Sequence, residues 1–175
     1  MLATGFYDGL IHPVLGIDHL LAMAGVGIIS VIFGNRAIWY IPGAFVVAMA
    51  VGGWLGLKSV MLPHSEAWIA ASLIVLGFAI AIGEKIFTSG KILPLLIVSI
   101  FVIVFGITHG NAHGIEAPQT AEPTAFVLGF LLGTSLLHLA GVATGLLSIR
   151  HSWFRFTLRT AGMFTAAFGL GLLTR

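Results

Sequence analysis

Histidine and carboxylate side chains gather in two short segments of this 175-residue chain. The first segment, GLIHPVLGIDHLLAM (9–23), contains His12, Asp18 and His19, although it is apolar enough to enter a lipid bilayer. An ionisable group in hydrocarbon costs at least about 2.5–3.5 kcal/mol. These three side chains therefore need a partner that offsets the cost.

The two histidines of the first segment are seven residues apart. Because seven residues make two helical turns, His12 and His19 share one face of a helix. Asp18 lies about 100° around the helix from His19, where it can bind an ion beside that histidine or orient its ring. The alternative is a pair of structural histidines bonded to backbone carbonyls, with Asp18 as their ion partner.

The second segment, THGNAHGIEAP (108–118), places His109 and His113 four residues apart, and Glu116 follows three residues later. If this turn is helical, all three side chains point the same way, and two imidazoles at this spacing can bind one ion. The alternative is a hydrated outer loop that is rich in histidine.

The composition indicates a membrane protein. Hydrophobic residues make up 58% of the chain and charged residues 8%, with a mean hydropathy of +1.09, whereas a soluble domain carries about 25% charged residues. We expect an all-α polytopic protein in the lipid bilayer, with residues 1–175 in a single bundle. The net charge of +2 is too small to indicate a nucleic-acid partner. The absence of cysteine excludes disulfides, thiolate metal sites and thiol nucleophiles.

Six apolar segments are long enough to cross a bilayer as helices. They cover about 13–33, 38–57, 66–87, 92–109, 123–149 and 153–174.

Pro13 and Pro123 stand where the first turn of a helix tolerates proline. Glycine pairs four residues apart predict close helix packing; they are 52/56, 106/110, 129/133 and 141/145. Residues 1–8 have neither a basic region nor an apolar core, so we expect no separable leader there.

Lysine and arginine fall mainly on one side of the predicted bundle. With alternating connections, one side holds Arg36, Lys85, Lys91, Arg150, Arg155 and Arg159, and the other holds Lys58 and Arg175. The positive-inside rule places the richer side in the cytoplasm, so both termini face out. Both histidine segments then reach the outer face of the membrane.

No lysine or arginine neighbours Asp18 or Glu116 in the sequence. A divalent cation would neutralise both carboxylates and would use the imidazoles as ligands. Nitrogen and oxygen donors without sulfur suit Ni²⁺, Co²⁺, Zn²⁺ or Mn²⁺. The sequence therefore predicts a metal site at the outer face.

A further histidine, His138, lies in the fifth predicted span. Counting from Pro123 at a rise of about 1.5 Å per residue places it roughly 22 Å deep, against roughly 9 Å for His19 counted from Pro13. We expect His138 to be a second station for the ion, below the outer site. The alternative is a core histidine bonded to a carbonyl of a neighbouring helix.

Three motifs give the chain a family resemblance. HPVLGIDHLLAM (12–23), HGNAHGIE (109–116) and LLHLAG (136–141) occur in one order within six spans. At these residues the chain resembles the HupE/UreJ family of nickel permeases, which are accessory proteins of hydrogenase and urease systems. Members often carry histidine where this chain has Asn111. The resemblance implies transport of Ni²⁺, or Co²⁺ in some members, across a bacterial inner membrane. The resemblance also implies that six residues are candidates for handling the metal: His12, Asp18, His19, His109, His113 and Glu116.

The favoured function is thus a permease with no catalytic residue and no prosthetic group. No G-x-x-x-x-G-K-[ST] nucleotide-binding loop is present, so the membrane potential is the expected driving force. Two alternatives stay open: a histidine-box di-iron membrane oxygenase, and a non-transporting metal sensor or complex subunit. The residues do not separate nickel from cobalt, and they leave the coupling ion and the oligomeric state open.

Overall fold

The chain folds into α-helices joined by short connections. The structure, a computed structural model, describes residues 2–83, 92–117 and 122–174. The helices are α1 (Leu2–Leu15), α2 (Ile17–Phe33), α3 (Ala37–Leu57), α4 (Ser65–Ile82), α5 (Ile92–Glu116), α6 (Pro123–Arg150) and α7 (Ser152–Leu173). Five helices are long and apolar enough to cross a membrane, and α1 with α2 makes a sixth span if the bent pair counts as one. The predicted all-α polytopic fold is confirmed.

The beginning of the first span differs from the prediction. The helix starts before Pro13, and a break at Gly16 bends α2 by 82° relative to α1. Pro13 therefore lies inside α1, where it lacks an N–H and weakens the helix just before the break. The Gly16 carbonyl accepts the first hydrogen bond of α2, from Leu20. The prediction that Pro13 opens a helix is wrong, whereas Pro123 does stand in the first turn of α6.

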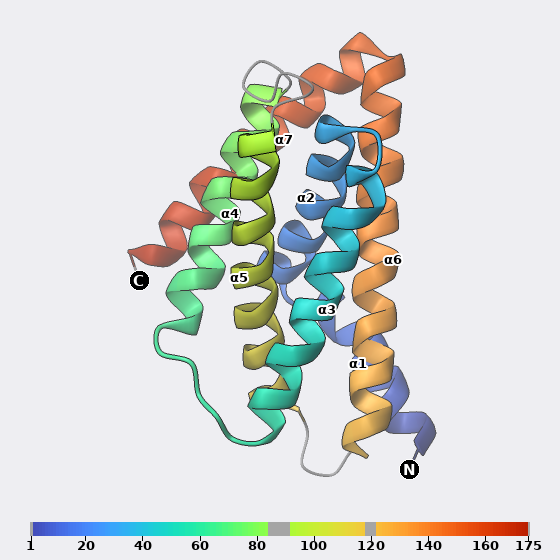
Figure 1. The fold of residues 1–175 in the computed structure, drawn as a ribbon, viewed down its shortest axis with the longest axis vertical. Helices are drawn as coiled ribbons and strands as arrows, with labels where there is room; N and C mark the ends of the chain where they lie inside the picture. Colours follow the sequence, from blue (N-terminus) through green and yellow to red (C-terminus); the bar gives the residue numbers. More distant parts are fainter. Residues whose placement is uncertain (1, 84–91, 118–121, 175) are drawn as a thin grey trace.

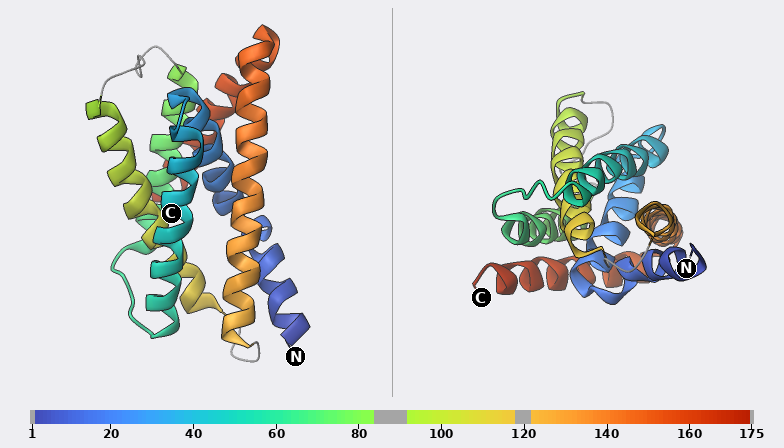
Figure 2. Two further views of the ribbon diagram at one scale, coloured as in Figure 1. Left: turned by 45° about the vertical axis from the view of Figure 1, so that its right-hand side comes forward. Right: turned by 90° about the horizontal axis from the view of Figure 1, so that it is seen from below.

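The glycines bring the helices into close pairs. α1 lies beside the lower half of α6, and α3 lies beside α5 (Figures 1 and 2). A Cβ at Gly52 or Gly110 would overlap the backbone of the facing helix of the α3–α5 pair. On α6, Gly129 and Gly133 admit α1 and Gly141 admits α2 in the same way, and a Cβ at Gly145 would meet the Val31 side chain of α2. The predicted close packing is confirmed, and it brings α1, α2, α5 and α6 within side-chain reach of one another.

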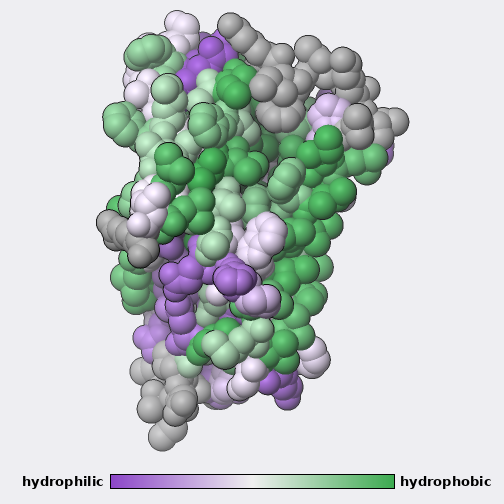
Figure 3. All heavy atoms as spheres, turned by 90° about the vertical axis from the view of Figure 1, so that its left-hand side faces the viewer, coloured by the Kyte–Doolittle hydropathy of each residue, from purple (hydrophilic) through white to green (hydrophobic). Residues whose placement is uncertain are grey.

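Four exposed tryptophans mark the two ends of the apolar surface. Trp39 and Trp153 stand at the start of α3 and α7, near one end, and Trp54 and Trp68 lie near the other. All four are at least 45% exposed, and tryptophan is enriched at both membrane–water interfaces. The face in Figure 3 is apolar over much of its area, with hydrophilic residues mainly in its lower half. This surface fits a protein that spans a bilayer.

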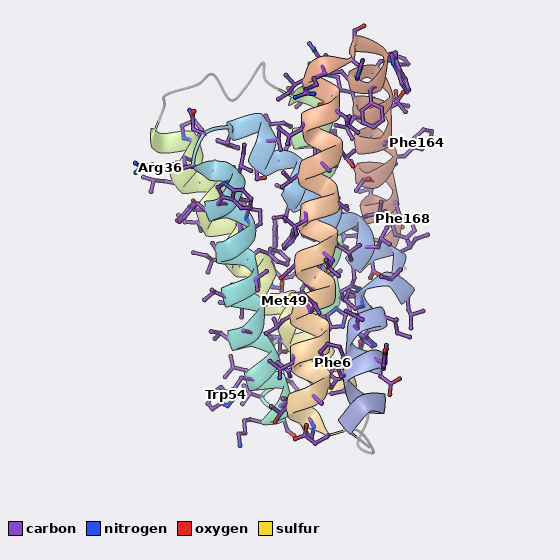
Figure 4. The ribbon with its side chains drawn as sticks, turned by 90° about the vertical axis from the view of Figure 1, so that its right-hand side faces the viewer. Phe6, Arg36, Met49, Trp54, Phe164 and Phe168 are labelled. Carbon is purple, nitrogen blue, oxygen red and sulfur yellow. The ribbon has the colours of Figure 1, made fainter. Side chains whose placement is uncertain are left out.

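Charged residues divide between the two ends of the bundle. One end, which we call the arginine end, carries Arg36, Arg150, Arg155 and Arg159 (Arg36 is labelled in Figure 4). The opposite end, which we call the histidine end, carries the acidic residues that the structure describes: Asp8, Asp18, Glu66, Glu116 and Glu122. Lys58 is the one lysine or arginine of the described chain at that end. Lys85, Lys91 and Arg175, which the charge argument also used, lie outside the described residues.

Candidate metal site

The candidate ligands lie on four helices that meet toward the histidine end. His12 lies on α1 and His138 on α6. Asp18 and His19 lie on α2, and α5 carries His109, His113 and Glu116. The ring of His113 lies 4.8 Å from that of His12 and 4.1 Å from that of His19, centroid to centroid. The ring of His19 in turn lies 5.2 Å from that of His109. Two segments far apart in the sequence therefore form one continuous group of imidazoles.

The outermost contacts join α1 to the end of α5. The helix α5 continues past the predicted end at 109 to Glu116, so His109, His113 and Glu116 follow one helical stripe as the spacing predicts. Glu116 Oε2 lies 3.4 Å from His12 Nε2 and 3.7 Å from His113 Nδ1. One ligand atom from each of the three residues lies within 4.8 Å of the other two. We call His12, His113 and Glu116 the outer triad.

The outer triad is open at one side and buried at the other. The side chain of Glu116 is 56% exposed, that of His12 26% and that of His113 3%. Ligand atoms that share one ion with bonds of about 2.1 Å lie about 3 Å apart. A small inward movement of these side chains would therefore let all three bind the same ion.

Asp18 and His19 form a pair at the break between α1 and α2. His19 Nδ1 donates to Asp18 Oδ1 at 2.9 Å. Asp18 stands in the first turn of α2, where the positive end of the helix stabilises a carboxylate. A Cβ at Gly16 would lie 2.9 Å from Asp18 Oδ1 and 3.0 Å from His19 Nδ1. The missing side chain thus leaves room for the pair, and the contact favours an orienting role for Asp18.

Two deeper histidines are oriented by backbone carbonyls. His109 Nδ1 donates to the Phe105 carbonyl at 2.8 Å, and His138 Nδ1 donates to the Met23 carbonyl at 2.7 Å. Because a carbonyl only accepts, Nδ1 carries the proton, and Nε2 of the neutral ring keeps a free lone pair. Both rings are buried.

Five buried ring nitrogens have no hydrogen-bond partner among the described residues. They are both ring nitrogens of His113 and the Nε2 atoms of His19, His109 and His138. A buried polar atom without a partner costs about 1–3 kcal/mol, so the group requires water or a ligand. Histidines that bind metals usually donate their other ring N–H to a carboxylate or a carbonyl. His19, His109 and His138 all have this arrangement.

His138 lies closer to the other histidines than the sequence predicts. Its hydrogen bond reaches Met23, which is one helical turn beyond His19, a rise of about 6 Å. Counting from the two prolines placed it roughly 13 Å deeper than His19. This predicted difference in depth is wrong because the break at Gly16 changes the helix axis between Pro13 and His19.

Three aromatic rings surround the imidazoles, and the sequence reasoning missed them. Phe126 and Phe130 of α6 contact the rings of His12 and His113, at centroid distances of 5.4 and 4.5 Å. Their spacing of four residues is a signal for one helical face, whereas Phe45 of α3 has no such signal. Figure 4 shows Met49, one turn from Phe45, on the part of α3 that faces the bundle.

Asn111, at the position where the resembling family often has histidine, has a structural role here. Its Nδ2 donates to the Val60 carbonyl at 2.8 Å, and its Oδ1 accepts from the Leu62 N–H at 3.1 Å. Both polar ends of this fully buried side chain are therefore used to hold the α3–α4 connection against α5. The Asn111 side chain thus fixes a loop.

Comparison with known proteins connects the chain to a family of membrane proteins. The family model described as HupE / UreJ protein matches residues 1–172. The chain is also similar to Protein HupE from Rhizobium leguminosarum bv. viciae, with 39% identity over 172 residues that make up 98% of this chain and 85% of that protein. No solved structure matches the chain.

Proposed function

The chain belongs to the HupE/UreJ family, and we propose that it is a permease that takes up Ni²⁺ or Co²⁺ from the histidine end. The observation that carries the proposal is the set of five buried ring nitrogens without a partner in the described chain. This set begins beside the carboxylate of Glu116 and extends inward to His138. Nickel and cobalt are bound by nitrogen and oxygen donors of this kind. We assign no catalytic activity to the protein.

The outer triad is the capture site in this proposal. Glu116 supplies a negative charge at the exposed side, and His12 and His113 supply two imidazoles on different helices. His19, oriented by Asp18, and His109 then offer the next ring nitrogens inward. The acidic residues that gather at the histidine end raise the local concentration of cations.

We propose that the histidine end faces the outside of a bacterial inner membrane, with both termini on that side. The support is the arginine end, because positively charged residues favour the cytoplasmic side. In this orientation the membrane potential drives a divalent cation inward by about 4.6 kcal/mol per 100 mV, at about 2.3 kcal/mol for each charge.

The test is uptake by the purified protein in liposomes that contain a metal-sensitive dye and carry an imposed potential. We expect wild-type protein to take up Ni²⁺, with Co²⁺ as a competitor. The variant His113→Ala should lose more than about 100-fold in uptake rate, because it removes a ligand and not only an orienting partner. His151→Ala, an exposed histidine at the arginine end, is the control and should transport normally.

Each other outcome points to another function. Binding of Ni²⁺ without any uptake would favour a metal sensor or a subunit of a complex. Iron in the purified protein, together with oxygen-dependent turnover, would favour the di-iron oxygenase. Loss of the His113→Ala protein from the membrane would favour a structural role for the histidines.

A further inference from the structure

We infer that Phe45 of α3 is a gate between the outer histidines and His138, and that its ring limits the rate at which an ion passes inward. The inference rests on the proposed transport function. It adds a residue that is not a ligand and that acts on the movement of the ion between two groups of ligands.

The ring contacts place Phe45 at a gap in the line of imidazoles. His12, His113, His19 and His109 follow one another ring to ring. For His138, the ring contact found in the described chain is with Phe45, at 5.1 Å and 87° between the planes. The same Phe45 ring lies 5.7 Å from that of His109, at 59°. Phe45 therefore stands next to the last histidine of the outer group and next to His138.

The hydrogen bonds show which of these three rings is free to move. His109 and His138 are each held through Nδ1 by a backbone carbonyl, so turning either ring would break that bond. Phe45 has no polar atom and is fully buried among apolar residues of the core. Its ring can therefore move without the loss of a hydrogen bond.

The helix around Phe45 is built to bend. Pro42 lies inside α3 less than one turn before Phe45, and it weakens the helix because it lacks an N–H. An open groove of about 380 Å³ between α3 and α6 is lined by residues that include Pro42, Gly43 and His138. The groove leaves α3 free to bend at Pro42 on the side next to His138.

Polar groups continue on the α6 side of Phe45. Thr134 lies one turn from His138 on the same face of α6, and its hydroxyl donates to Met49 Sδ at 3.5 Å. Both Thr134 and Met49 are fully buried. Both lie one turn toward the histidine end from Phe45 and His138, because α3 ends and α6 begins there. An ion that moves inward therefore meets a hydroxyl and a thioether before it reaches the His138 imidazole.

The experiment compares ring size at position 45 in liposomes loaded with a Ni²⁺-sensitive dye. Phe45→Leu should raise the uptake rate about threefold, and Phe45→Trp should lower it at least about fivefold, because a step that gates passage sets the overall rate. Both variants should keep the Ni²⁺ affinity of the outer site within about twofold, since they do not touch the outer triad. Leu73 of α4, fully buried in the same core, supplies the controls Leu73→Val and Leu73→Phe, which should change neither quantity.

The outcomes separate the gate from the transport function. If wild-type protein takes up no Ni²⁺, the proposed function itself fails. If wild-type protein transports and both Phe45 variants match it per folded molecule, the gate is overturned and the transport function stands. Should Phe45→Trp not accumulate in the membrane, Phe45→Leu and Pro42→Ala decide: the first should speed uptake and the second, which stiffens α3, should slow it. Normal rates in both would overturn the gate.

Discussion

Two carboxylates, Asp18 and Glu116, contact histidines in this protein, and the two contacts differ in kind. Asp18 precedes His19 in the sequence, and both belong to the first turn of α2. Their atoms lie 2.9 Å apart, a hydrogen-bond distance. This pair forms within one helix and sets the direction of one ring.

Glu116, in contrast, joins two helices. Its Oε2 lies 3.4 Å from His12 on α1 and 3.7 Å from His113 on its own helix α5. Both distances are longer than that of the Asp18–His19 pair, and the Glu116 side chain is more exposed than Asp18. An ion between these three groups would shorten both gaps at once.

The difference shows how to tell an orienting carboxylate from a ligand. A partner that is next to its histidine in the sequence completes its bond without an ion. Glu116, which meets histidines of two helices, makes a long hydrogen bond of 3.4 Å to His12 and stays 3.7 Å from His113, so an ion can enter between the three groups. We therefore assign orientation to Asp18 and binding to Glu116, and conservative variants distinguish the two roles.

The largest effect is expected for Glu116→Gln. The amide keeps the shape but removes the negative charge, so Ni²⁺ affinity measured by titration calorimetry should fall about 100-fold, at the upper end of effects known for groups around a metal. Glu122→Gln is the matched control, because Glu122 accepts from the Ala125 N–H at 2.8 Å as the N-cap of α6 and Gln keeps this acceptor. An unchanged affinity in Glu116→Gln would break the comparison, since the carboxylate would then not be a ligand.

A smaller effect is expected at Asp18, and there the amide should restore function. Asp18→Ala should lower Ni²⁺ affinity about tenfold, as for the loss of an orienting partner. Asp18→Asn should recover most of this loss, because its amide oxygen still accepts the His19 Nδ1–H. If Asn at this position were as damaging as Ala, Asp18 would act through its charge and would be a ligand like Glu116.

Much of the bundle and half of the site were predictable from the sequence. Apolar length predicted the spans, and glycine spacing predicted the close packing at Gly52 and Gly110, because small residues are what close helix contacts require. The i, i+4 spacing predicted the stripe of His109 and His113, which the continued helix confirms.

The remaining features depend on contacts that the sequence does not encode locally. Pro13 fits both the first turn of a helix and a position inside one, so the break at Gly16 was not predictable from it. The depth of His138 depends on that break. Phe45 is one apolar residue among many in α3, and its role follows only from the rings that α5 and α6 bring against it.

The smallest effect on binding is expected at His138, which extends the comparison to a histidine that has a carbonyl and no carboxylate as its partner. His138→Ala should leave Ni²⁺ affinity at the outer site within about twofold, because the outer triad lies on the other side of His19 and His109. Uptake should slow about tenfold, because a path through a membrane needs stations that bind and release the ion.

The matched variant is His138→Gln, whose amide can still donate to the Met23 carbonyl and so keep α6 joined to α2. If His138 only packs, Gln should transport at the wild-type rate while Ala does not. If its Nε2 is a station, both variants should be slow, because neither supplies an imidazole. A loss of outer-site binding in both would instead make His138 a primary ligand, and the outer triad would then be only part of the capture site.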